Sequence, residues 1–143
     1  GHGRVLDGDG AAGAGRQGAL DDFGTSARAR RYAWRAWVKF ATTPVVGEVV
    51  EIYWKSSDGT HPDNDDGTGD AAVSAEDKLR NLTPIGNIIV DEASITPEFV
   101  GSGEIVIPHR HGAPVIWNAT ADGLSSTAGD HGFQLTPIPD EVQ

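Results

Sequence analysis

The 143-residue sequence contains no cysteine and no methionine. Without cysteine the chain can form neither a disulfide nor a thiolate metal site, and redox chemistry does not indicate a compartment. No apolar run approaches the ~20 residues that a membrane-spanning helix needs, and no signal segment opens the chain. Hydrophobic residues make up 38% of the chain and charged residues 22%. We therefore expect one soluble globular domain and no membrane partner.

Basic residues become scarce after the first 40 positions. Residues 1–40 hold seven basic and four acidic side chains, a net charge of +3, whereas residues 41–143 hold four basic and seventeen acidic side chains, a net charge of −13. An acidic body repels phosphate backbones, so we expect no nucleic-acid partner. The N-terminal part could instead meet an acidic protein surface, including that of a neighbouring copy.

Large apolar side chains are also few in residues 1–24, which contain eight of the 19 glycines. Ordering such a segment costs conformational entropy and returns little apolar burial. The sequence therefore predicts a flexible arm over residues 1–27, which is either a mobile tail or a docking arm. In the docking case Leu20 and Phe23 would fill pockets on a partner. The basic residues that would meet carboxylates on that partner are Arg16, Arg28 and Arg30.

A period-two pattern begins at Arg31 and predicts half-buried strands over Arg31–Phe40 and Glu48–Lys55. A hairpin formed by these two strands is the natural interpretation. A capping box at Ser74 predicts one short helix, from Ala75 to about Asn81. Further strands are expected at Ile85–Val90, Phe99–Val100, Glu104–Ile107, Val115–Asn118 and Phe133–Thr136. This pattern predicts an all-β domain over residues 28–143, a single antiparallel β-sandwich or jelly roll with one short helix.

His109 and His111 form the sharpest chemical signal, because imidazoles two residues apart on a strand share a face and could reach one metal. With Gly103 ahead of them, they resemble the first half of the cupin motif. Val115 and Ile116 stand where that motif has a glutamate. Since metal sites rarely work with two ligands, we expect no metal and no cofactor. A cupin-like metal-dependent enzyme using the two histidines is one alternative function.

Trp37 alternates onto the strand face that also carries Arg35 and Lys39, which predicts an exposed tryptophan. Such a side chain is a candidate partner-binding anchor. Stacking of Trp37 on a sugar is a second alternative, and it would make the protein a carbohydrate-binding module. The sequence has no Gly-x-Ser-x-Gly elbow and no phosphate-cradling glycine loop after a predicted strand, so we expect no catalytic residues.

Residues from about Arg28 to Gln143 resemble virion structural proteins of tailed bacteriophages. The segments that carry the resemblance are Arg31–Phe40, Pro44–Trp54, Ser57–Thr60, Asn81–Gly86 and Leu135–Gln143. It implies a non-enzymatic β-sandwich protein of the capsid decoration or cement type, located in the virion on the capsid surface or the head or tail exterior. The partners it implies are the major capsid protein or other virion proteins, together with further copies of this chain in a homo-oligomer.

Overall fold

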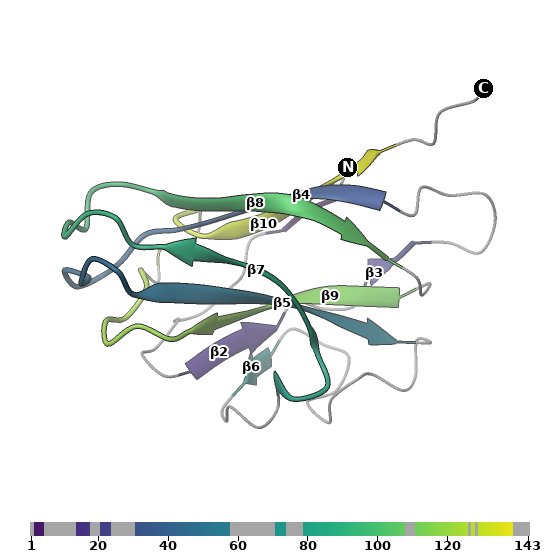
Figure 1. Ribbon diagram of the computed structural model, residues 1–143, viewed down its shortest axis with the longest axis horizontal. Helices are drawn as coiled ribbons and strands as arrows, with labels where there is room; N and C mark the ends of the chain where they lie inside the picture. The colour runs from purple at the N-terminus through teal and green to yellow at the C-terminus, as the bar shows by residue number, and fades with distance from the viewer. Residues whose placement is uncertain are drawn as a thin grey trace.

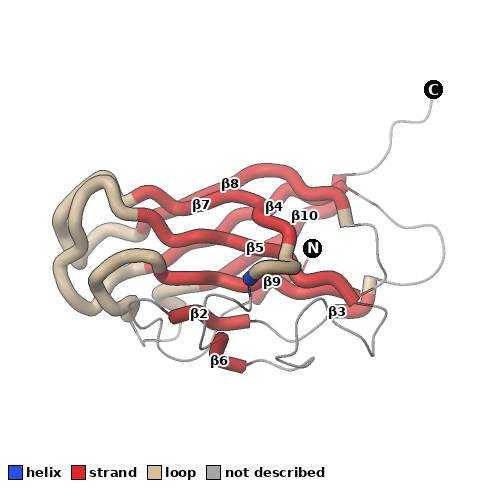
Figure 2. The backbone as a smooth tube through the Cα atoms, turned by 60° about the horizontal axis from the view of Figure 1, so that its bottom comes forward, coloured by secondary structure: helices blue, strands red, loops and turns tan. Residues whose placement is uncertain are grey.

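The protein is an all-β molecule in a computed structural model that describes residues 2–4, 14–17, 21–23, 31–57, 71–73, 79–107, 111–125, 127 and 129–138. The described strands are β1 (His2–Arg4), β2 (Ala14–Gln17), β3 (Asp21–Asp22), β4 (Arg31–Val38), β5 (Val49–Ser57), β6 (Ala71–Val73), β7 (Thr83–Ile89), β8 (Phe99–Val106), β9 (His111–Asn118) and β10 (Gly132–Ile138). They lie in two layers, as Figure 1 and Figure 2 show.

The two layers are antiparallel sheets. The first sheet has the order β1-β10-β4-β8, and the second has the order β6-β2-β9-β5-β7, with β3 also paired to β9. This arrangement confirms the predicted all-β sandwich. The predicted helix Ala75–Asn81 lies mostly outside the described residues. At its described end Leu82 donates a backbone hydrogen bond to Leu79 at 3.1 Å, which forms a tight turn.

Strand β4, and β5 as far as Trp54, show the burial alternation that their sequences predict, but the two strands do not form a hairpin. Strand β4 pairs with β10 and β8, whereas β5 pairs with β9 and β7. The hairpin interpretation is wrong because each strand turns its apolar face to the same core from a different sheet. Residues 39–48 therefore cross from one layer to the other.

Aromatic rings from both sheets meet in the middle of the sandwich. Trp34 of the first sheet stacks on Phe133 with ring centroids 6.1 Å apart, and Trp54 of the second sheet lies 6.2 Å from the same phenyl ring. Phe23 contacts Trp54 at 5.9 Å and Tyr32 at 5.5 Å. Each ring is less than one-tenth exposed, so this cluster joins the two layers through apolar burial.

Glycines make room for the two central indoles. A Cβ atom on Gly86 would lie 2.6 Å from the Trp34 ring, and one on Gly103 would lie 2.9 Å from Trp34 Nε1. A Cβ atom on Gly112 would lie 2.5 Å from the Trp54 ring. Real Cβ atoms do not approach so closely, so both tryptophans pack directly on backbone.

Proline positions agree with the strand pairing. Pro114 lies inside β9, a strand with neighbours on both sides, where a residue without an N–H is unusual. On one side of β9, pairing with β2 ends at Val115 and pairing with β3 covers only His111 and Gly112. Pro114 lies between these two paired segments, so neither β2 nor β3 needs its missing N–H. Pro137 of β10 likewise lies beyond Leu135, where pairing with β1 ends.

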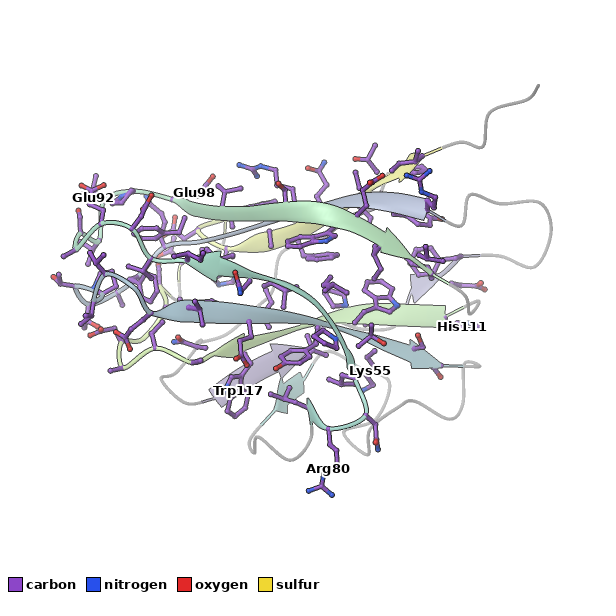
Figure 3. All side chains as sticks on the ribbon, in the orientation of Figure 1. Lys55, Arg80, Glu92, Glu98, His111 and Trp117 are labelled. Atoms are coloured by element: carbon purple, nitrogen blue, oxygen red, sulfur yellow. The ribbon has the colours of Figure 1, made fainter. Side chains whose placement is uncertain are left out.

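A second apolar cluster covers part of the outer face of the second sheet. It contains Val115 and Trp117 of β9 together with Leu79 and Leu82 from the segment that precedes β7, and Tyr53 packs against it. Figure 3 shows Trp117 on this side of the sheet. The sandwich therefore buries apolar side chains on both faces of β9, which explains its nearly continuous burial.

The structure corrects the prediction of an N-terminal arm outside the domain. The described residues of this segment form β1, which pairs with β10, β2, which pairs with β9 and β6, and β3, which pairs with β9. Phe23 is 7% exposed inside the central cluster, so it fills a pocket of its own chain rather than one on a partner. The sheets supply backbone partners to this segment, which offset the entropy cost of ordering it, and its glycine content gave no sign of them.

The placement of Phe23 predicts that the N-terminal segment stabilises the fold. Phe23→Ala should lower the free energy of unfolding by about 3–5 kcal/mol, since it removes a buried ring from the core. Urea unfolding followed by tryptophan fluorescence measures this, with the exposed change Thr136→Ala as the control. A loss no larger than that of the control would contradict the assignment of Phe23 to the core.

Candidate interaction surfaces

Three loops meet at one end of the sandwich, which we call the loop end: residues 39–48, residues 90–98, and residues 119–125 with 129–131 (Figure 1). The amide of Ala41 donates to the carbonyl of Gly123 at 2.9 Å, which ties the first loop to the third. The loop end is therefore held by direct backbone contacts between segments that lie far apart in the sequence.

A tight turn projects Val45 and Val46 from the loop end. The amide of Glu48 donates to the carbonyl of Val45 at 3.2 Å, and Gly47 adopts a φ of 99° that favours glycine. Gly47 also donates to the carbonyl of Val90 at 2.8 Å. The turn is thus fixed to the end of β7, and the two valines have a defined position.

A buried polar network fixes the third loop. The Asn118 side chain donates to the carbonyl of Asp122 at 2.8 Å and accepts from the amide of Thr120 at 3.1 Å. The amide of Asp122 in turn donates to the Thr120 hydroxyl at 3.1 Å. These bonds satisfy buried polar atoms within the loop. Together with the turn, they give the loop end a preorganised shape.

Large aliphatic side chains are exposed at this end. They are Val45 at 57%, Val46 at 58%, Ile89 at 59% and Ile95 at 48% exposure. The exposed carboxylates of Asp91 and Glu92 lie in the same loop as Ile95. Figure 3 shows Glu92 at the tip of this end. Exposed apolar groups with a polar rim are typical of protein interaction sites.

The outer face of the first sheet carries Trp37, the residue predicted to be exposed. Its side chain is half-buried: the Arg35 guanidinium lies 4.9 Å from the ring centroid, and its Nε1 donates to the carbonyl of Gly129 at 3.3 Å. Arg35 also pairs with Glu98 at 3.2 Å. One face of the indole is therefore occupied by a cation, which reduces the surface available for stacking on a sugar.

Strand pairing brings three polar residues into one row on the second sheet, because His111 is opposite both Asp22 and Ser57. His111 Nε2 lies 3.8 Å from Asp22 Oδ2, and its Nδ1 has no hydrogen-bond partner among the described residues. Ser57 is only 4% exposed. The row has the residue types of a hydrolase triad, but its serine is covered and no hydrogen bond is formed at His111 Nδ1.

The remaining predicted site residues are placed only in part. Arg16 lies in β2 with its backbone opposite Ile116. The residues outside the described part of the chain are Leu20, Arg28, Arg30 and His109. Within the described residues, no group of three or more His, Cys, Asp or Glu side chains is arranged to hold a metal ion. In the same residues no helix has the length and apolar character to cross a membrane.

Comparison of the sequence with protein-family models and with curated proteins finds no match in either.

The loop end was not predicted as a binding site. The adjacent valines between Pro44 and Gly47 were its only sequence signal, because apolar residues in a turn are unusual. The Asp22–His111–Ser57 row had no sequence signal, since it depends on the register of three strands.

The surroundings of His111 predict that the two histidines are not needed for folding or for metal retention. The double change His109→Ala and His111→Ala should alter the free energy of unfolding by no more than about 1 kcal/mol, because the contact between His111 and Asp22 is long, at 3.8 Å, and partly open to solvent. Elemental analysis after dialysis should find no stoichiometric transition metal in the unchanged protein. Bound metal that disappears in the double variant would contradict this.

Proposed function

We propose that this protein is a non-enzymatic structural component of a tailed-phage particle, of the capsid decoration or cement type. The observation that carries the proposal is the loop end, where exposed aliphatic side chains stand on two hydrogen-bonded loops, Val45, Val46 and Ile95, and at the end of β7, Ile89. A rigid surface of this kind loses little conformational entropy on binding, so its apolar contacts contribute to affinity more fully. The resemblance of residues 28–143 to phage virion proteins supplies the identity of the partner.

Charge supports a protein partner with basic character. The body of the chain from residue 41 carries a net charge of −13, and the exposed residues Asp91 and Glu92 lie between Ile89 and Ile95 in the sequence. A partner surface with an apolar centre and a basic rim would therefore complement the loop end. We propose that such a surface belongs to the major capsid protein or another virion protein, on the exterior of the head or tail.

The double change Val46→Asp and Ile95→Asp tests this role. Both side chains are exposed, so the variant should keep its unfolding temperature, while its affinity for purified particles should fall at least tenfold, or about 1.4 kcal/mol. Thr136→Asp is the matched control, because it adds an exposed carboxylate near the opposite end of the sandwich. Co-sedimentation with particles of the encoding phage measures the affinity.

Two outcomes would contradict the proposed function. In the first, mass spectrometry of purified particles finds no copies of this chain. In the second, the chain is present at a fixed copy number but the Val46 and Ile95 variant binds as well as the control. The first outcome would reject the virion role, and the second would reject the loop end as its binding surface.

A further inference from the structure

Strand β8 is the one long described strand whose outer edge is open and unprotected. It closes the first sheet, and among the described residues no strand pairs with its second edge. The edge strands β1 and β6 have three residues each, and β7 carries Pro84, which cannot donate to a neighbouring strand. Strand β8 has eight residues and no proline or lysine. Natural edges of this length are usually blocked, paired or covered.

The neighbouring strand β7 does not cover this edge. A Cβ atom on Gly101 would point to the core and lie 2.7 Å from the carbonyl oxygen of Asn87. Strand β7 therefore packs against the inner face of β8, and no described strand pairs with the edge of β8 in the plane of the first sheet. Figure 1 shows β8 at the border of the molecule.

The sequence of β8 is complementary to itself in one antiparallel register. When Gly103 is placed opposite Gly103 of a second copy, Val100 lies opposite Val106 and Ser102 lies opposite Glu104. Val100 is 46% and Val106 is 60% exposed in the single chain. The register therefore forms two symmetric apolar cross-strand pairs, and apolar pairs of this kind stabilise sheets.

The only charged side chain in β8 does not oppose this pairing. Glu104 is bonded to Arg31 on the neighbouring strand at 2.7 Å, which partly balances its charge. In the symmetric register it faces Ser102 rather than the second Glu104, so like charges are not directly opposite. A two-fold axis at Gly103 means that both copies use the same edge, so the assembly ends at two chains, as in other isologous dimers.

We propose that this protein forms a two-fold dimer in which the β8 edges of two copies pair antiparallel around Gly103. The pairing joins the two first sheets into one continuous sheet, in the manner of β-strand addition. The pairing uses the edge of β8 and none of the four exposed aliphatic residues of the loop end, so the dimer does not depend on the proposed role in a particle. An edge contact is small for a specific interface, so we expect dimerisation in the micromolar range.

Charge changes at the paired valines test the register. Sedimentation equilibrium over a concentration series should show a monomer–dimer equilibrium for the unchanged chain. Val100→Glu with Val106→Glu places two carboxylates opposite each other across the axis and should raise the dissociation constant at least tenfold. Val100→Glu with Val106→Lys places opposite charges there and should restore dimerisation. Because both side chains are exposed, unfolding temperatures measured well below the dissociation constant, where all variants are monomeric, should agree among the variants.

Cysteine variants test the same register without relying on charge, and the chain has no cysteine of its own. In the proposed dimer residue 100 lies ~5 Å from residue 106 of the second copy, within reach of a disulfide. Residue 100 lies ~20 Å from residue 100 of that copy, six residues along the strand. Val100→Cys with Val106→Cys should therefore give a covalent dimer on mild oxidation, and Val100→Cys alone should not.

The proposal is overturned if the unchanged chain stays monomeric throughout the series. It is also overturned if the paired glutamates leave dimerisation intact, or if the single and double cysteine variants cross-link equally. If the glutamate variant fails to fold, the cysteine comparison decides the result by itself.

Discussion

The fold depends on the packing of two indole rings against backbone. Trp34 and Trp54 come from opposite sheets, and each ring occupies space that a side chain at Gly86, Gly103 or Gly112 would otherwise fill. Phe133 lies between the two rings and completes the connection across the layers. This contact fixes the distance between the sheets at the centre, and the other inward-facing residues pack around it.

The sequence predicted this architecture where its pattern was local. Alternation in β4 and β5 correctly identified the buried faces, which include Trp34 and Trp54, because the period of two depends only on strand geometry. Pairing between strands is not local, and the hairpin expected for β4 and β5 was wrong. The role of Phe23 was also missed, since a glycine-rich segment gives no sign of the sheet edges that accept it.

Sites that depend on how neighbouring strands are aligned could not be predicted from the sequence. The row of Asp22, His111 and Ser57 exists only because β3 and β5 both pair with β9, and those residues are far apart in the sequence. Trp37 was correctly placed on the outward face of β4, but the sequence did not indicate that Arg35 lies over its ring. The sequence did not predict that Val45 and Val46 are exposed, because their position depends on the turn that Gly47 forms with its φ of 99°.

We propose that this sandwich acts by presenting its loop end to another protein. Hydrogen exchange with mass spectrometry, comparing the free protein with the protein bound to purified phage particles, tests it most directly. Binding through the loop end should slow exchange of the backbone amides in residues 39–48 and 90–98, while amides near Thr136 should exchange at the same rate in both states. Protection confined to the opposite end of the sandwich, or no protection on bound particles, would contradict the claim.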